Sequence, residues 1–252
     1  KNIETDEHII GVAKEILKGL SALIGTYEHT EWRNELKEKS ERFPLRYRTD
    51  VLSGGGAITE IYRQTKGQAL ITTEVGQHQM WAAQFYYYSE PRQFITSGGL
   101  GTMGYGLGAA IGAKTARPDK TVVNIAGDGG FRMNMNEIIT SVRNNIPIIE
   151  VIIDNRVLGM VRQWQTLFYG GRYSHTVLED RTDYVKLAES MGAIGLRAET
   201  PEEFRDAFAK ALKADRTVVI DCRIDKDENV YPMVAPGDAI SQAFDAEDMQ
   251  NM

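Results

Sequence analysis

The sequence is short of the features that define several classes of protein. Its single cysteine, Cys222, excludes an intramolecular disulfide and fits a reducing compartment. Its 29 Lys and Arg residues against 35 Asp and Glu leave a net charge of −6, which argues against a general nucleic-acid-binding protein. The longest weakly polar run, over 98–113, is shorter than the roughly 20 residues of a membrane span. Because no apolar signal-peptide core follows the polar first residues, we expect a soluble, cytoplasmic protein without membrane or nucleic-acid partners.

The composition that is present is typical of a globular chain, with 42% hydrophobic and 25% charged residues. The first part of the chain differs from the rest. Apolar residues from Ile9 to Leu20 recur at helical spacing, and the charged stretch over 31–42 is typical of a solvated helix or linker. Because these segments precede any strand able to build a core, we expect the chain to begin inside a longer protein, with its main domain over 43–252.

From about residue 68, short apolar strands alternate with helices. This pattern is typical of a parallel sheet covered on both faces, so the predicted fold class is α/β, with about six strands sandwiched by helices. Gly104, Gly108 and Gly112 recur every four residues, which we interpret as a smooth helix face for close packing. The predicted strands lie over 69–73, 94–96, 121–126, 146–153, 194–198 and 217–223, and the predicted helices over 102–116, 135–143, 183–191 and 201–213.

A glycine-rich segment, Gly-Asp-Gly-Gly at 127–130, follows one of these strands. It would stand at the carboxyl end of the strand, where open parallel sheets bind ligands. Asn134 and Glu137 have the spacing of a capping box, so we expect a helix to begin there and to form an anion site with the glycines. A carboxylate such as Asp128 beside an anion implies a divalent cation between them. The alternative is a tight turn in which Asp128 is a local cap.

A second polar pair, Asp154 and Asn155, ends the next predicted strand along the chain. If the two strands are neighbours, Asp128 and Asn155 emerge at the same edge of the sheet. A carboxylate, a carboxamide oxygen and a backbone carbonyl are hard ligands that suit Mg²⁺, which completes its shell with phosphate oxygens and water. This pairing is much more specific than a single glycine-rich turn.

The same pairing is the pattern of thiamine diphosphate enzymes, and three further segments narrow the resemblance. They are E-V-G-Q-H-Q-M-W at Glu74–Trp81, S-G-G-L-G-T-M-G-Y-G-L at Ser97–Leu107, and N-R-V-L-G-M-V-R-Q-W-Q-T-L-F-Y-G-G-R-Y-S-H-T at Asn155–Thr176. From about Thr49 to Met233 the chain closely resembles the catalytic large subunit of acetolactate synthase, also called acetohydroxyacid synthase.

The resemblance implies a domain organisation and partners. Family members are more than twice this length, with a pyrimidine-binding, a central and a C-terminal diphosphate-binding domain. Residues 1–42 would be the tail of the central domain and a linker, and 43–252 the C-terminal thiamine diphosphate domain. A catalytic glutamate and most of the FAD site lie in the other domains, so we expect this chain alone to be inactive and to bind the cofactor weakly. Homodimers or tetramers and a small regulatory subunit are also implied.

The resemblance also assigns residues to the cofactor. Asp128, Asn155 and the backbone carbonyl of Val157 match Mg²⁺ ligands, whereas Asp154 is taken to support the turn. Residues 76–79 match a loop around the diphosphate. The complete set of implied cofactor-binding residues is Gly76, Gln77, His78, Gln79, Gly101, Met103, Gly127, Asp128, Gly129, Gly130, Asn155, Val157, Gly159 and Met160.

Three residues are implied to act near the reacting atoms. Met103 matches the bulky side chain that supports a bent cofactor, while Met160 and Trp164 face the active site. Trp164 would bound the pocket for the second 2-keto acid and favour the longer 2-ketobutyrate. On spacing alone, Met160 and Trp164 are also typical of a buried core stripe.

The implied reaction is the decarboxylation of pyruvate on thiamine diphosphate and condensation of the hydroxyethyl unit with pyruvate or 2-ketobutyrate. This reaction belongs to valine and isoleucine biosynthesis. The nearest alternative is another thiamine diphosphate carboligase or decarboxylase, of the glyoxylate carboligase or pyruvate oxidase type. A non-catalytic module with a vestigial site is a further alternative. A P-loop or Rossmann site is disfavoured, because neither glycine spacing is present.

Overall fold

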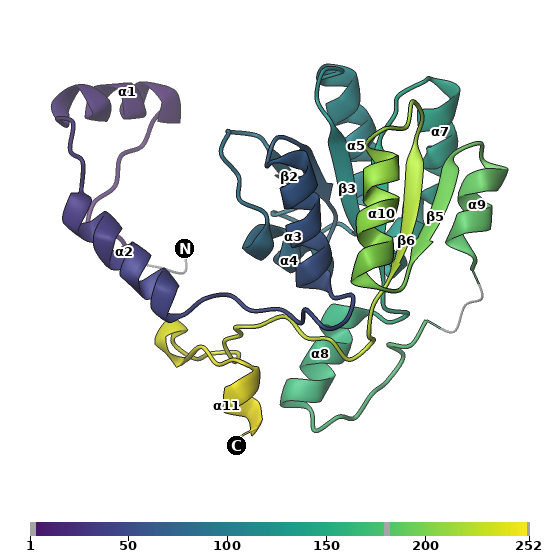
Figure 1. Ribbon diagram of the computed structural model, residues 1–252. Helices are drawn as coiled ribbons and strands as arrows, with labels where there is room; N and C mark the ends of the chain where they lie inside the picture. Colours follow the sequence, from purple (N-terminus) through teal and green to yellow (C-terminus); the bar gives the residue numbers. More distant parts are fainter. Residues whose placement is uncertain (1–3, 179–181, 251–252) are drawn as a thin grey trace. The chain divides into compact units, whose positions relative to one another are not determined.

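The computed structural model describes residues 4–178 and 182–250 (Figure 1). The chain divides into two compact units, over 1–44 and over 45–252. No helix within the described ranges is long and apolar enough to cross a bilayer. The assignment of the first unit to the tail of a central domain stays a prediction.

The smaller unit contains two helices, α1 (Ala13–Leu23) and α2 (Thr30–Arg42), and neither of them buries a residue. The helix predicted from Ile9 begins only at Ala13, and Ile9 itself is exposed. Helix α1 buries no residue, and an isolated helix of this length is only marginally stable. This explains why the helix does not extend back to Ile9.

The larger unit is built on one sheet of six strands, all of them paired in parallel (Figure 1). Their order across the sheet is β2-β1-β3-β4-β6-β5, so β3 and β4 are neighbours at its centre. The predicted α/β fold with about six strands is therefore confirmed. The strands are β1 (Leu70–Thr73), β2 (Phe94–Thr96), β3 (Val122–Gly127), β4 (Ile149–Asp154), β5 (Ile194–Ala198) and β6 (Val218–Arg223).

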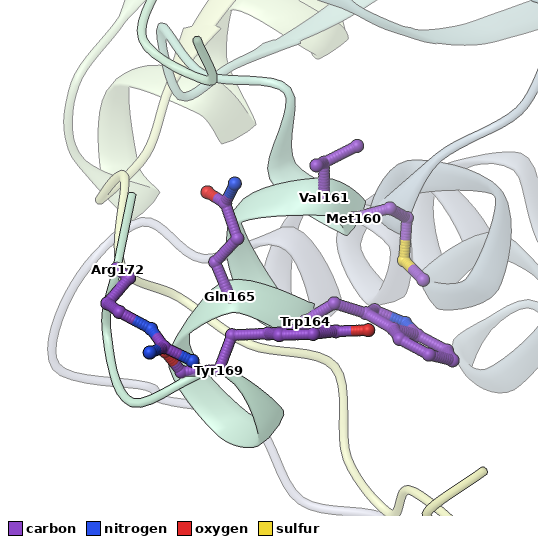
Figure 2. Close-up of a pocket in the computed structure, with 6 residues that line it drawn as sticks. All are labelled: Met160, Val161, Trp164, Gln165, Tyr169 and Arg172. Atoms are coloured by element: carbon purple, nitrogen blue, oxygen red, sulfur yellow. The ribbon is translucent and has the colours of Figure 1, made fainter. Parts of the chain in front are cut away.

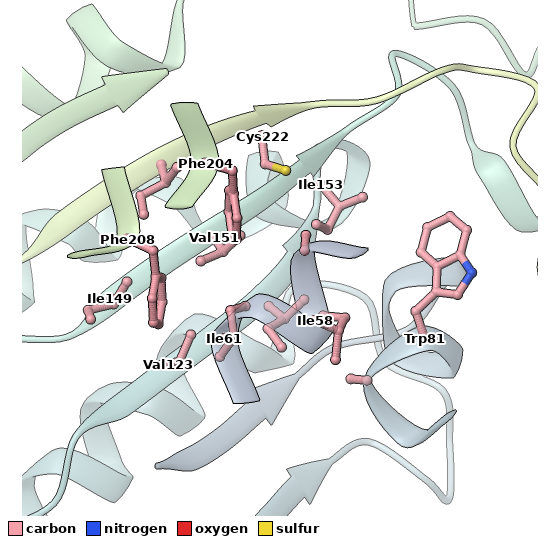
Figure 3. Packing of buried hydrophobic residues seen from close by; sticks show 14 of the residues in the cluster. Ile58, Ile61, Trp81, Val123, Ile149, Val151, Ile153, Phe204, Phe208 and Cys222 are labelled. Carbon is pink, nitrogen blue, oxygen red and sulfur yellow. The ribbon is translucent and has the colours of Figure 1, made fainter. Parts of the chain in front are cut away.

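Each face of the sheet is covered by helices, because alternate residues of the buried strands point to opposite faces. On one face, α3 (Gly54–Thr65), α4 (Gln77–Phe85) and α10 (Pro201–Ala211) form a core with side chains such as Val123 and Val151 (Figure 3). On the other face lie α5 (Tyr105–Ala116), α6 (Asp128–Asn134), α7 (Ile138–Arg143) and α9 (Tyr184–Ser190). Both cores fix the carboxyl edge of the sheet from which the candidate site is built.

The short 3₁₀ helix Met135–Glu137 joins α6 to α7, and Met135 packs against the second core. The other elements are α8 (Gly159–Phe168), α11 (Ala246–Gln250) and a second 3₁₀ helix, Ile240–Gln242. The described part of the C-terminal tail thus contains two short helical segments.

The predicted capping box at Asn134 and Glu137 is wrong. Helix α6 begins at Asp128, directly after the strand, and Asn134 is its last residue. The side chain of Asn134 donates to the carbonyl of Gly104, and that of Glu137 accepts from Thr140. The side chain of Asn134 does not cap a helix, because it contacts Gly104, a residue far away in the sequence.

The predicted close-packing face of α5 is also wrong for the described residues. Gly108 and Gly112 are exposed, and a Cβ added at either would meet no atom within 4 Å. Instead, Gly106 lies against the sheet, where a Cβ would come within 2.4 Å of Asn124 Oδ1. Gly104 has a positive φ of 80° just before the helix, a conformation that glycine adopts without strain.

Candidate functional site at the carboxyl edge of the sheet

The candidate site lies where β3 and β4 end. The two strands pair in parallel with Gly127 opposite Ile153, so Asp128 and the Asp154-Asn155 pair leave the sheet at the same edge. This confirms the adjacency of the two strands on which the predicted metal site depends. Asp128, Asp154 and Asn155 are all buried.

Asp128 is held in an unfavourable environment for a carboxylate. Its Oδ1 accepts from the backbone amide of Gly129 at 3.0 Å, and its carboxyl group interacts with that of Asp154. Burial, followed by the charge of Asp154, raises the pKa of Asp128 to about 8. Two buried carboxyl groups side by side are stabilised by a cation, and their oxygens are the ligands that Mg²⁺ prefers.

Asp154 has a larger part in the site than the sequence indicated. Burial and the charge of Asp221 raise its pKa to about 6, and Arg223, with Nε 3.7 Å from Asp154 Oδ2, opposes this. Asp154 also accepts from the amide of Arg156 at 3.2 Å, which fits the predicted role of supporting the turn. The interaction of Asp154 with Asp128 could have been inferred from the pairing of the two strands, which places residue 154 beside residue 128.

The turn that carries Asn155 is held by side-chain hydrogen bonds. Asn155 Nδ2 donates to Gln77 Oε1 at 3.1 Å, and its Oδ1 accepts from the amide of Val157 at 3.1 Å. Gly159 packs against the same groups, because a Cβ there would lie 2.0 Å from Gln77 Oε1. The described residues contain no group of three or more His, Cys, Asp or Glu side chains able to hold a metal. The predicted ligand set, with one carboxylate, an amide oxygen and a backbone carbonyl, stays a prediction.

The segment predicted to wrap the diphosphate is the start of a helix rather than a loop. Gly76 precedes α4, and Gln77–Gln79 form its first turn, in which the amide of Gln79 already donates to the carbonyl of Gly76 at 3.2 Å. The first backbone amides of a helix are the groups that can bind an anion. The side chain of Gln77 donates to Gln163 Oε1 and to the carbonyl of Glu228, and Gln79 donates to Thr96. These two amide side chains therefore tie the helix start to the surrounding protein.

His78 is buried and carries an unsatisfied polar atom. Its Nε2 has no hydrogen-bond partner and lies 3.3 Å from Glu74 Oε1. Burial lowers the pKa of His78, and the charge of Glu74 opposes the shift. The ring lies against two glycines, since a Cβ at Gly76 or Gly127 would come within about 3 Å of it (2.8 and 3.0 Å).

Glu74 is a residue of this site that sequence reasoning missed. It follows β1 directly, is almost fully buried, and accepts from the backbone amides of Gly127 at 2.9 Å and Gly104 at 3.1 Å. The available signal was a charged residue at the end of a fully buried strand, at the same edge as the glycine-rich segment.

Met103 lies near the glycine-rich segment. A Cβ at Gly129 would stand 3.6 Å from Met103 Cε and 3.0 Å from Leu158 Cδ2. Gly101 has a positive φ of 66° in the turn before α5, where glycine is favoured. The predicted cofactor residues 101–103 and 127–130 are thus brought together by the fold.

An open pocket of about 550 Å³ lies beside α8 (Figure 2). Met160 and Trp164, both predicted to face the active site, belong to its lining, whereas α8 buries the polar residues Arg162 and Gln163. The alternative interpretation of α8 as an apolar core stripe is therefore wrong. The residues that line the pocket are Met160, Val161, Trp164, Gln165, Tyr169 and Arg172.

Ionic and ring contacts hold the segment around this pocket. Arg162 donates to Asp227 Oδ1 from Nε at 2.8 Å, and its guanidinium lies 3.9 Å from the centre of the Tyr173 ring. Trp164 packs edge-on against Phe168. Arg162 thus joins α8 to the segments on either side of it, and Arg172 is the cation among the pocket residues.

Comparison with known proteins gives a consistent picture. Residues 74–222 match the family model described as thiamine pyrophosphate enzyme, C-terminal TPP binding domain. The chain is 37% identical over 256 residues to the acetolactate synthase isozyme 3 large subunit of Escherichia coli, covering 97% of this chain and 45% of that protein. It is 42% identical over 246 residues to the acetolactate synthase large subunit of Corynebacterium glutamicum, covering 92% and 39%. The chain spans less than half the length of these relatives.

A solved structure with the same fold comes from another thiamine diphosphate enzyme. It is the 4-hydroxybenzoylformate decarboxylase of Rhodococcus jostii, with a TM-score of 0.66 and 25% identity. The match covers 73% of this chain and 34% of that one.

Proposed function

The chain belongs to the thiamine pyrophosphate enzymes through their C-terminal TPP binding domain, and we propose that it is the cofactor-binding part of an acetolactate synthase catalytic subunit. The observation that carries the proposal is the pair of buried carboxyl groups, Asp128 and Asp154, beside Asn155 at the carboxyl edge of adjacent strands. The substrates would be pyruvate and, as second acceptor, pyruvate or 2-ketobutyrate. The product would serve branched-chain amino acid biosynthesis.

In this proposal Asp128, Asn155 and the carbonyl of Val157 hold Mg²⁺, which neutralises the diphosphate end of the cofactor. The raised pKa of Asp128 supports a cation here, because a bound cation compensates both burial and the charge of Asp154. The amides at the start of α4 and the glycines at 127–130 would receive the phosphate oxygens.

When bound, thiamine diphosphate supplies the nucleophile and the electron sink for decarboxylation of a 2-keto acid. The chain's own part is to bind and orient. The carbonyl of Gly101 would accept from the 4′-amino group of the cofactor, and Met103 would support its bend from beside Gly129. Met suits this position because its flexible thioether fills irregular space.

The pocket beside α8 would receive the second 2-keto acid. Trp164 and Met160 give it an apolar wall, which would favour the extra methylene of 2-ketobutyrate by roughly 1–3 kcal/mol. Arg172, which lines the same pocket, would be the charge partner for the acceptor's carboxylate.

The rest of the active site would come from outside this chain. We propose that the parent protein also binds FAD, assembles as a homodimer or tetramer, and pairs with a small subunit. This chain alone would then be inactive and bind the cofactor weakly. Formation of acetolactate by the purified chain would contradict that.

The test is calorimetric titration of the chain with Mg²⁺ and thiamine diphosphate together and singly. We expect binding that needs the metal and is lost in Asp128→Ala and Asn155→Ala. Asp119→Ala removes an exposed carboxylate paired with Arg117 and serves as the control. Metal-independent binding, or equal binding by Asp128→Ala, would sink the proposed site. Product analysis of the full-length protein with pyruvate, 2-ketobutyrate and glyoxylate separates acetolactate synthase from glyoxylate carboligase or pyruvate oxidase.

A further inference from the structure

Glu74 connects three segments that are distant in the sequence. Its Oε1 accepts from the amide of Gly127, at the end of β3, and its Oε2 accepts from the amide of Gly104, before α5. The same Oε1 lies 3.3 Å from Nε2 of His78, in the first turn of α4. One buried carboxylate thus touches each of the segments 76–79, 101–104 and 127–130.

The space that Glu74 occupies is created by Gly130. A Cβ at residue 130 would lie 1.7 Å from Glu74 Oε2 and 1.8 Å from Oε1, which no side chain could tolerate. The backbone of Gly130 does not require glycine, because its φ is not positive. Gly130 is therefore explained by the room that the carboxylate of Glu74 needs.

We propose that Glu74 is a positioning residue, paired with Gly130, that aligns the three cofactor-binding segments and orients the ring of His78 toward the diphosphate. The inference rests on the proposed function for what the segments bind, but the arrangement of Glu74, Gly130 and His78 is independent of it. In this proposal Glu74 acts through the two amides from which it accepts and through its charge beside Nε2 of His78, rather than by touching the cofactor itself.

The charge of Glu74 has a particular consequence for His78. Because a carboxylate faces Nε2, it favours a proton on that nitrogen and supports the charged form of the ring. Burial in the surrounding core acts in the opposite direction. The protonation of His78 therefore reports on Glu74 even when no ligand is bound.

The first experiment is a double-mutant cycle between residues 74 and 130. The chain variants Glu74→Ala, Gly130→Ala and the double variant are titrated with Mg²⁺ plus thiamine diphosphate and with Mg²⁺ plus inorganic pyrophosphate. We expect each single change to weaken binding about 10- to 100-fold, as losses of supporting contacts commonly do. In the Glu74→Ala background the methyl group added at position 130 enters vacated space, so Gly130→Ala should change binding by less than about threefold.

The second experiment reads the His78 ring directly. Glu74→Gln keeps the shape of the side chain but removes its charge, so the pKa of His78 should fall further below its usual value. Nitrogen chemical shifts of His78, followed against pH well below the melting temperature, measure this. Glu150→Gln is the matched control, because Glu150 is another fully buried carboxyl group in the same sheet and its hydrogen bonds go to Asn124 rather than to the three segments. It should leave both His78 and pyrophosphate binding unchanged.

The outcomes separate the two proposals. If the unmodified chain binds neither thiamine diphosphate nor pyrophosphate with Mg²⁺, the proposed function fails, while thermal stability of the cycle and the His78 titration still test Glu74. If the chain binds but Gly130→Ala is equally damaging with and without Glu74, or if Glu74→Gln leaves the His78 titration in place, the pairing of Glu74 with Gly130 and His78 is overturned.

Discussion

Glu74 and Asp128 are two buried carboxyl groups at the same edge of the sheet, and they differ in the groups that surround them. Both are nearly fully buried, 1% and 3% exposed, and both adjoin the end of β3. Glu74 is solvated by the chain itself, through two backbone amides that come from different segments. Asp128 accepts from the amide of its own neighbour and faces another carboxyl group. The first arrangement is that of a side chain that braces the fold, and the second fits the proposed role of a ligand for a cation.

The largest effect should come from removing the brace. Glu74→Ala leaves the amides of Gly104 and Gly127 without their acceptor and opens a cavity above Gly130. We expect the free energy of unfolding to fall by about 3 kcal/mol. Urea denaturation of the chain measures this, and a loss below about 0.5 kcal/mol would show that the two amides find other partners.

Removing the proposed ligand should have the opposite sign in the absence of metal. Asp128→Asn keeps the shape of the side chain and removes the cost of either burying an anion beside Asp154 or taking up a proton on folding. We expect the metal-free chain to gain on the order of 2 kcal/mol in stability. Melting curves with and without Mg²⁺ and thiamine diphosphate should show a higher midpoint for the variant and no further rise on adding them. A destabilised variant would mean that Asp128 is a brace as well.

Glu150 sharpens the comparison as a third buried carboxyl group. Both of its oxygens accept from the single amide group of Asn124, and burial raises its pKa to about 8. Because the folded chain binds this proton more tightly than the unfolded chain, stability should fall as pH rises from about 4.5 to about 8. Glu150→Gln should flatten that part of the curve and gain about 1 kcal/mol at a pH of about 8.5. Parallel pH profiles for the two proteins would contradict the assignment.

The smallest effect should come from a carboxylate that water solvates. Asp119 pairs with Arg117 on the surface, where both side chains are more than half exposed. Exposed pairs contribute little, because solvent replaces the lost partner. Asp119→Ala should leave the melting temperature and Mg²⁺-dependent binding unchanged. A measurable loss of either would show that burial does not explain why substitutions at these carboxylates differ in their effects.

Much of the fold could be predicted because strand composition is a local property. Each of the six strands was recognisable as a short apolar run, and the parallel arrangement follows from the helices between them. The strand predicted from Ile146 begins instead at Ile149, after Pro147, which lacks an amide hydrogen for pairing. The prediction of a helix cap at Asn134 was wrong because the side-chain amide of Asn134 donates to the carbonyl of Gly104, which lies at the start of another helix.

Residue order alone determined which segments carry the proposed ligand oxygens and the glycines, since Asp128, Asn155 and their flanking motifs are contiguous with the strands they follow. It could not reveal that Glu74 fills the space above Gly130, or that Asp154 faces Asp128. Those relations join strands that are separated in the chain, and they exist only once the sheet has brought their carboxyl ends together. A buried carboxylate can stabilise the fold when hydrogen-bond donors from other segments satisfy it, and it is suited to bind a cation when they do not. Tertiary packing alone decides how many such donors lie beside it.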